Sequence, residues 1–349
     1  MKSRIFKTNL LVLAVLLVLN NTTTATTITG ATHTVNKVND DDPNTQVKNY
    51  SKTYAVDGND VLKINNRYGK ITVNTWAKNE VKVDVQIKVA ASNAADTKKL
   101  LDNISISDSK EGSTVTFTTN MASNKTSSWT SWFGGRGSSY RNLEINYTVY
   151  MPAKNPLNIS NKYGAVSLPD LDGKVNIEVA YGGFAAKSLT GLDNTIDVKY
   201  GSADIESIRT GDINVKYGSL KVGSADKLNA DMGYGSAKIG RLTTSGTMNL
   251  KYGGNFEITN VSKSIKNLMI NSVYTNIKLG LGNEINTDFD VTVRFGNFSY
   301  GSNAVGVVNK NASSRRTWSP TQSFTGHLGK GDTNKAISIN ATYGAVKFD

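Results

Sequence analysis

The sequence predicts an all-β protein, a parallel β-solenoid or β-helix with coils of 17–19 residues, a strand-rich amino-terminal segment and one short helix. Two observations predict this class. A Tyr-Gly dipeptide recurs every 17 to 19 residues, a period too short for a domain but suited to one solenoid coil. Apolar residues also stand at fixed offsets around each Tyr. The dipeptides are Tyr163-Gly164, Tyr181-Gly182, Tyr200-Gly201, Tyr217-Gly218, Tyr234-Gly235 and Tyr252-Gly253, with a later one at Tyr343-Gly344.

Residues 1–25 are predicted to be a secretory signal peptide. Basic residues precede an apolar run from Leu10 to Leu19, and small residues end the segment at Ala25. The run is about 10 residues long, whereas a bilayer-spanning helix needs roughly 20. We therefore expect an exported chain (periplasmic, outer-surface or secreted) that is not transmembrane.

The composition limits the chemistry of the chain. It has no cysteine, so we expect no disulfide and no lipid-anchoring cysteine. The formal net charge is +12, and removal of the signal peptide leaves +9. Such an excess can indicate nucleic acid, an anionic membrane or an acidic polysaccharide. We expect no nucleic-acid partner for an exported protein, and the lysines, scattered on alternate strand positions, are typical of a solvated face.

The segment before the coils is predicted to be polar and flexible at first and then rich in strands. Apolar residues alternate from Val81 to Val89, which indicates a half-buried strand. The alternation then breaks in a short helical pattern that Ser92 can cap. The predicted parts are a flexible leader over 26–56, a strand-rich part over 57–156, a helix over 92–104 and an aromatic loop over 121–140.

Residues 157–349 are predicted to form the coils. Apolar residues stand four and two positions before each Tyr and three and five after it, which describes two short strands joined by a bend. This parity predicts that the Tyr side chain points inward and that its ring stacks on the ring of the next coil. The Gly is assigned to the bend because it reaches positive φ without a Cβ penalty.

The spacing loosens toward the carboxyl end. Tyr274-Thr275 and Phe295-Gly296 are interpreted as degenerate bends, a late insertion over 302–336 as a cap on the open end, and 337–349 as a final coil. Near the amino end, Tyr68-Gly69 has the pattern of an early coil.

The stretch from Asn65 to Val73, with Trp76 and the strand from Asn79 to Val83, resembles the opening of the putative bacterial adhesin family of β-strand-repeat proteins. A helical insertion, a strand ending at Pro152 and Gly-centred coils follow in that family's order, over roughly residues 56–349. The resemblance implies the solenoid fold and transfers no catalytic residue. Many members have Asp after the coil Gly, whereas this chain has Ser or Ala, so the surface chemistry of that Asp is not carried over.

Two outward columns flank the Tyr positions. Stacked carboxylates in the first column could bind calcium. Alternatively, the lysines of the second column neutralise them and the asparagines form an amide ladder, which needs no metal, so no metal or cofactor is predicted. The first column holds Glu178, Asp197, Asn214, Asp231, Asn249 and Asn271, and the second Lys199, Lys216 and Lys251.

The predicted binding residues lie where the repeat is interrupted. Exposed aromatic residues beside Arg are typical of binding hot spots, although these rings could instead cover an open end of the solenoid. The first cluster is Trp129, Trp132, Phe133, Arg136 and Tyr140, and the second is Arg315, Arg316 and Trp318.

Catalysis is not expected, because His33 and His327 are the only histidines and no cysteine nucleophile is present. The alternative is a calcium-dependent carbohydrate-active β-helix enzyme that uses carboxylates, with Asp204, Glu206 and Arg209 as its nearest trio. The sequence thus predicts a non-enzymatic exported adhesin, envelope protein or carbohydrate-binding protein. Its expected partner is a surface glycan or an envelope protein.

Overall fold

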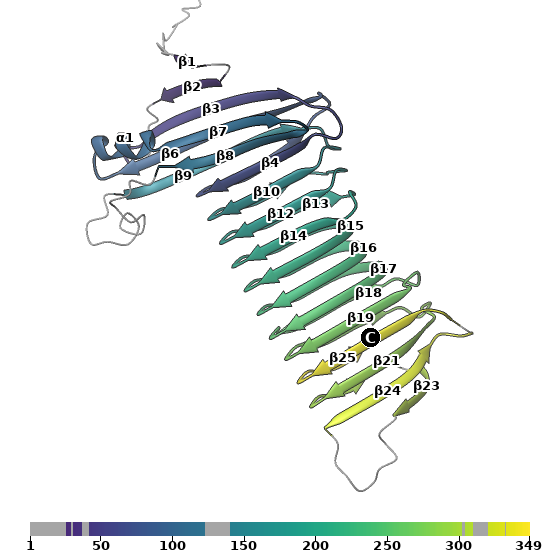
Figure 1. The fold of residues 1–349 in the computed structure, drawn as a ribbon. Helices are drawn as coiled ribbons and strands as arrows, with labels where there is room; N and C mark the ends of the chain where they lie inside the picture. The colour runs from purple at the N-terminus through teal and green to yellow at the C-terminus, as the bar shows by residue number, and fades with distance from the viewer. Residues whose placement is uncertain are drawn as a thin grey trace, which may run out of the picture.

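The computed structural model describes residues 26–28, 31–36, 42–122, 140–301, 304–309, 320–331 and 333–349. These residues form β-strands and one α-helix, so the predicted all-β class is confirmed. A mainly antiparallel sheet at the amino end leads into a long stack of parallel strands that extends toward the carboxyl end (Figure 1).

The amino-terminal sheet is antiparallel through β3, β6 and β9. Residues 46–55 form β3, which pairs with β6 along its whole length, so the prediction of a flexible leader is wrong for these residues. Val47 and Tyr50 of β3 are buried, but polar residues between them conceal the strand pattern. The strands of this sheet are β1 (Thr26–Ile28), β2 (Ala31–Asn36), β3 (Gln46–Ala55), β6 (Glu80–Ala91) and β9 (Tyr140–Met151).

The predicted helix is α1 (Ala94–Asp102), which lies at one end of this sheet (Figure 1). Its N-cap is Asn93 and not Ser92, because the Asn93 side chain accepts a hydrogen bond from the Asp96 N–H at 2.9 Å. Leu100 and Leu101 are buried, so the apolar face of α1 packs against the sheet.

Two strands connect the amino-terminal sheet to the stack. β4 (Val61–Arg67) runs parallel to β10 (Leu157–Lys162), and β5 (Ile71–Thr75) runs parallel to β11 (Val166–Leu168). Their other neighbours are β8 (Thr114–Met121), which forms a hairpin with β7 (Ile104–Glu111), and β9. β4 and β5 therefore form a coil of the same kind as the later ones, as Tyr68-Gly69 predicted.

Successive repeats build two parallel ladders, and each repeat supplies one extended segment to each ladder. In the first ladder Ile177 pairs with Ile196, which pairs with Ile213. In the second ladder Phe184 pairs with Ala203, which pairs with Leu220. The strands are β10 (Leu157–Lys162), β11 (Val166–Leu168), β12 (Val175–Ala180), β13 (Phe184–Leu189), β14 (Asn194–Lys199), β15 (Ala203–Lys216), β16 (Leu220–Gly233), β17 (Ala237–Lys251), β18 (Asn255–Val261), β19 (Asn267–Val273) and β20 (Asn276–Leu281). Each of β15, β16 and β17 is one continuous strand that runs through both ladders.

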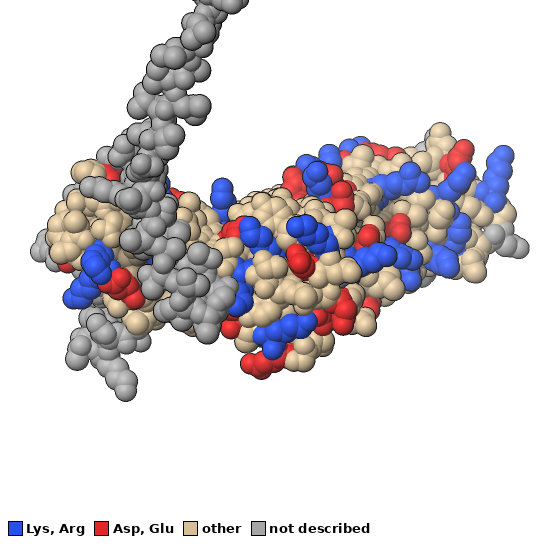
Figure 2. Space-filling view, turned by 90° about the horizontal axis from the view of Figure 1, so that it is seen from above, with Lys and Arg blue, Asp and Glu red and all other residues tan. Residues whose placement is uncertain are grey.

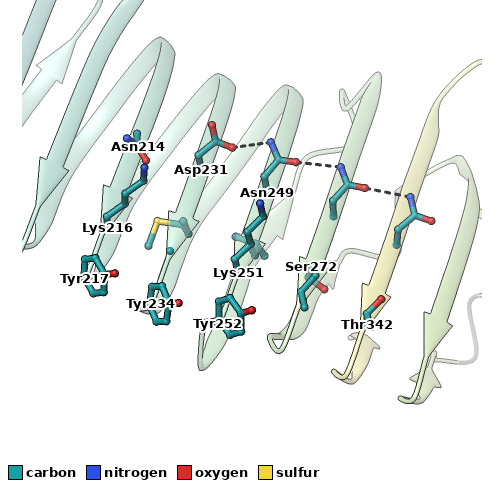
Figure 3. A pocket seen from close by; sticks show the side chains of 16 residues that line it. Asn214, Lys216, Tyr217, Asp231, Tyr234, Asn249, Lys251, Tyr252, Ser272 and Thr342 are labelled. Carbon is teal, nitrogen blue, oxygen red and sulfur yellow. Dashed lines mark hydrogen bonds between the residues drawn. The ribbon is translucent and has the colours of Figure 1, made fainter.

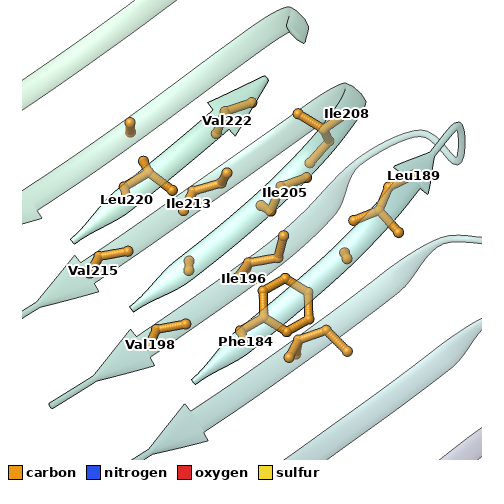
Figure 4. Close-up of a cluster of buried hydrophobic side chains, with 14 of the residues drawn as sticks. Phe184, Leu189, Ile196, Val198, Ile205, Ile208, Ile213, Val215, Leu220 and Val222 are labelled. Carbon is orange, nitrogen blue, oxygen red and sulfur yellow. The ribbon is translucent and has the colours of Figure 1, made fainter. Parts of the chain in front are cut away.

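The core lies between the two ladders. Figure 4 shows side chains of both ladders meeting there, among them Ile196 and Val198 from the first and Phe184 and Ile205 from the second. All four are buried. The offsets counted in the sequence thus identify the inward residues of both strands, because each strand alternates buried and exposed positions.

At the corner, both residues of the Tyr-Gly dipeptide differ from the prediction. Tyr, and not Gly, has the positive φ, for example 57° at Tyr217 and 58° at Tyr234. This left-handed corner turns the side chain outward, and Tyr234 is 52% exposed, so the predicted inward position is wrong. The following Gly is needed for close approach instead, since a Cβ on Gly235 would stand 1.7 Å from the Gly218 carbonyl oxygen.

The last coil in the sequence is not the last in space. β25 lies between β19 and β21, with parallel pairing on both sides (Figure 1). β26 likewise lies between β20 and β22. β24 then pairs antiparallel with the other edge of β21, and β23 with β24. The bounds are β21 (Thr287–Arg294), β22 (Phe298–Ser299), β23 (Ala304–Asn309), β24 (Thr321–Leu328), β25 (Ala336–Thr342) and β26 (Val346–Phe348).

Candidate binding groove

An open groove of about 940 Å³ crosses the first ladder beside its Tyr corner. The residues that line it occupy equivalent positions on β15, β16, β17, β19 and β25 (Figure 3). We call its three parallel rows the amide row, the lysine row and the tyrosine row. The amide row comprises Asn214, Asp231, Asn249, Asn271 and Asn340, the lysine row Lys216, Gly233, Lys251, Val273 and Thr342, and the tyrosine row Tyr217, Tyr234 and Tyr252.

The amide row is a hydrogen-bonded ladder with one direction. Asn249 Nδ2 donates to Asp231 Oδ1 at 2.7 Å, and Asn271 Nδ2 donates to Asn249 Oδ1 at 3.2 Å (Figure 3). Asn340 continues the row by donating to Asn271 at 3.3 Å. The amide ladder expected from the sequence is therefore present. No group of three or more His, Asp and Glu side chains that could hold a metal ion is found in the described part of the chain.

The lysine row has an interruption at Gly233. Lys199, just beyond the groove, pairs with Asp197 at 3.3 Å. Within the described residues, the side chains of Lys216 and Lys251 have no such carboxylate partner. Acidic and basic side chains are mixed over the face that Figure 2 draws, so the two lysines are set apart by their place in the groove and not by their charge.

The tyrosine row is part of a continuous column of stacked rings. Neighbouring ring centroids are 4.7–5.5 Å apart and the planes differ by 1–14° from Tyr68 to Phe295, with Tyr343 stacked between Tyr274 and Phe295. The predicted stacking is confirmed. Because each interior ring is covered on both faces by its neighbours, the column presents ring edges and hydroxyls to a ligand.

Most of the binding residues predicted from the sequence lie outside the part of the chain that the structure describes. Trp129, Trp132, Phe133, Arg136, Arg315, Arg316 and Trp318 lie outside the described residues, and Tyr140 begins β9 without a described side chain. The proposed enzymatic trio lies on the second ladder. There, exposed Asp204 forms an ion pair with Lys221 at 3.1 Å, which is an ordinary arrangement on a solvated strand.

Two groove features were missing from the sequence-based site. Gly233 interrupts the lysine row, a gap that can be found by aligning the repeats. Asn340 and Thr342 lie 69 residues or more from their groove neighbours in the chain. They join the groove only because β25 is inserted beside β19, and no repeat spacing signals this.

A second polar cluster lies in the amino-terminal part. The hydroxyls of Tyr50 and Tyr54 on β3 both donate to the carboxylate of Asp108 on β7. Burial, and then the hydrogen bond to Asp108, raise the pKa of Tyr54 to about 12 and also raise the pKa of Tyr50. This cluster connects two strands that are not paired with each other, which indicates a structural role.

Several solved structures are similar to this chain at low sequence identity. No family model matches the chain, and no curated protein is similar to it in sequence. A putative adhesin from Bacteroides fragilis is 12% identical, over 86% of this chain and 97% of that one, with a TM-score of 0.36. A putative lipid binding protein from Parabacteroides distasonis is 10% identical, over 86% and 96%, with a TM-score of 0.39. A putative adhesin from Parabacteroides merdae is 9% identical, with the same coverage and TM-score.

Proteins named as adhesins are thus among the structural neighbours, as the resemblance in the sequence predicted. The described residues contain no helix of the length and apolarity that crossing a membrane requires.

Proposed function

We propose that the protein is an exported, non-enzymatic β-solenoid that acts as an adhesin or as an envelope or carbohydrate-binding protein. It binds a surface glycan or an envelope component along the groove. The observation that carries this proposal is the groove itself, in which amide and hydroxyl groups repeat at the spacing of the coils and two ammonium groups lie beside them. A row of this kind suits an extended polymer, because one contact is repeated at each coil and the contacts add together.

A glycan array with the mature chain, with and without calcium, tests this proposal. Asn249→Ala should weaken binding, because it removes a side chain from the middle of the amide row. Asn229→Ala is the matched control, since Asn229 donates to Asp212 at the same 2.7 Å on the same ladder but does not line the groove. Equal binding by the two variants would assign the amide row a structural role only.

The two aromatic clusters are proposed as a second binding surface. Replacing Trp129, Trp132 and Phe133 together with Ala should reduce attachment and leave the thermal melt unchanged. If attachment persists in this variant, the aromatic loop is not the binding surface and the groove alone carries the function.

The enzymatic alternative makes a separate prediction. It requires depolymerisation of an acidic polysaccharide that is lost with a chelator or in Asp204→Asn. The ion pair of Asp204 with Lys221, on an exposed strand, favours the binding protein over this alternative.

A further inference from the structure

We infer that the groove binds a carboxylated polysaccharide, with carboxylates of alternate sugars at Lys216 and Lys251 and the sugar between them in a notch over Gly233. This inference deepens the proposed function and rests on it, since it names the class of glycan and its place in the groove.

The notch at Gly233 is not required by the backbone. A Cβ on Gly233 would meet only Lys216 Cγ, at 3.8 Å, which is an ordinary contact, and its φ lies outside the left-handed region. At the corner the opposite holds, since a Cβ on Gly218 would stand 1.7 Å from a backbone oxygen. The chain can therefore accept a side chain at position 233, and its absence leaves an open space between two lysines.

The two lysines are available to an external anion. Within the described residues neither ammonium has a carboxylate partner. On the second ladder, by contrast, Lys221 pairs with Asp204 at 3.1 Å and Lys238 with Glu257 at 3.4 Å. Figure 3 shows Lys216 and Lys251 on either side of the β16 strand, both extending toward the amide row. Such ammonium groups bind carboxylates by charge-assisted hydrogen bonds, as they also bind phosphates.

The spacing fits alternate sugars of an extended chain. The rings of Tyr217, Tyr234 and Tyr252 are 4.9 and 5.0 Å apart, so Lys216 and Lys251 stand on the order of 10 Å apart at their backbones, two strand spacings. A twofold extended polysaccharide presents the same group on the same side at every second sugar, which is a comparable distance.

The other groups of the groove favour a polysaccharide over a polyanion that has no hydroxyl groups. The Asp231 carboxylate lies on the same strand as the notch and is exposed. It accepts a hydrogen bond from Asn249 and has capacity for further donors. The Asp231 carboxylate accepts hydrogen bonds from sugar hydroxyls, which a polyanion without hydroxyls cannot donate. The amides of the row and the edge hydroxyls of Tyr234 and Tyr252 supply further partners.

The test compares four polymers on the purified mature chain by titration calorimetry: polygalacturonate, alginate, neutral dextran and polyglutamate. We expect the two carboxylated polysaccharides to bind, and their affinity to fall as salt is added. Dextran and polyglutamate should bind roughly tenfold more weakly or not at all, because the first lacks the anion and the second lacks the hydroxyls.

Variants locate the site. Lys216→Gln/Lys251→Gln should weaken polygalacturonate binding roughly tenfold, whereas the matched pair Lys221→Gln/Lys238→Gln on the second ladder should leave it unchanged. Gly233→Val should reduce the affinity without lowering the melting temperature, because it fills the notch with a residue that favours strands.

The outcomes separate this inference from the proposed function. Dextran binding that equals polygalacturonate binding, or an unchanged affinity in both groove variants, overturns the inference and leaves a glycan-binding protein. Polyglutamate binding as tight as polygalacturonate binding shows simple charge attraction and overturns the sugar assignment. If no polysaccharide binds at all, the inference and the proposed glycan function are both wrong.

Discussion

At the scale of single residues, the Tyr of each corner adopts the positive φ that was predicted for the Gly. The Tyr adopts the left-handed conformation, which costs a non-glycine residue about 1–3 kcal/mol. The rings then stack on both neighbours, and each stack contributes about 0.5–1.5 kcal/mol. The Gly has an ordinary φ but stands against the backbone of the preceding coil. In each dipeptide, ring stacking therefore offsets the conformational strain of the Tyr. The Gly then allows the backbones of two coils to lie close together.

Gly218→Ala should lower the free energy of unfolding by about 3 kcal/mol, because its Cβ would stand 1.7 Å from the Gly201 carbonyl oxygen and a neighbouring strand must shift. Gly233→Ala is the control within the same ladder. Its nearest contact is at 3.8 Å, and it should be neutral or stabilising by about 0.5 kcal/mol. Urea unfolding of the two variants measures both values, and equal losses would contradict the close-contact explanation.

Tyr217→Ala and Tyr217→Gly separate stacking from strain. Both variants lose the stacks with Tyr200 and Tyr234, which should cost about 1–3 kcal/mol. Gly relieves the left-handed strain and Ala does not, so the Gly variant should be the more stable of the two by about 1 kcal/mol. An Ala variant as stable as the Gly variant would mean that the corner carries no strain.

At the scale of elements, strong periodicity was predictive and weak periodicity was not. Apolar and polar residues alternate without exception from Val81 to Val89, and the apolar residues are the buried positions of β6. In β3, buried Val47 and Tyr50 are separated by two polar residues, so its pattern lacks the alternation of a strand. β3 is a strand because β6 supplies a partner for its whole length, which is tertiary information.

The cluster of Tyr50, Tyr54 and Asp108 predicts a loss of stability at alkaline pH. Tyr54 has a pKa of about 12 in the folded protein, against about 10 for an unfolded chain. A raised pKa means that the contribution of the neutral hydroxyl is complete below about pH 10 and is lost as the pH rises toward about 12.

Denaturant unfolding between about pH 9 and about pH 11 should therefore show a declining free energy of unfolding. Tyr54→Phe removes one of the titrating groups and should flatten this decline. A Phe variant with an unchanged pH dependence would place the effect on other groups.

At the scale of the whole molecule, the inserted final coil decides how the carboxyl end is built. β21 and β22 pair with β25 and β26, and these in turn pair with β19 and β20, so the inserted coil lies between the other two. A repeat array is stabilised mainly by contacts between neighbouring repeats. The last residues of the chain thus join two coils that would otherwise expose strand edges.

Deletion of residues 336–349 should release the end of the stack and leave the middle folded. Backbone amides of β21 and β24 should exchange hydrogen about tenfold faster or more, while those of β12 and β14 should keep their protection. Hydrogen exchange followed by mass spectrometry of the deletion variant and the full chain measures both regions. Unchanged exchange in β21 would show that this strand does not depend on the inserted coil.

The sequence by itself determined the all-β class, the coil period, the inward residues of each strand and the outward amide and lysine columns. All of these depend on local alternation and on a repeat length that recurs in the chain. Only the tertiary structure decided the conformation of the Tyr corner, the partner of β3, and the insertion of β25 that brings Asn340 and Thr342 into the groove. The physical reason is that these features depend on which backbone lies one strand spacing away, and that neighbour can be 69 residues distant in the chain.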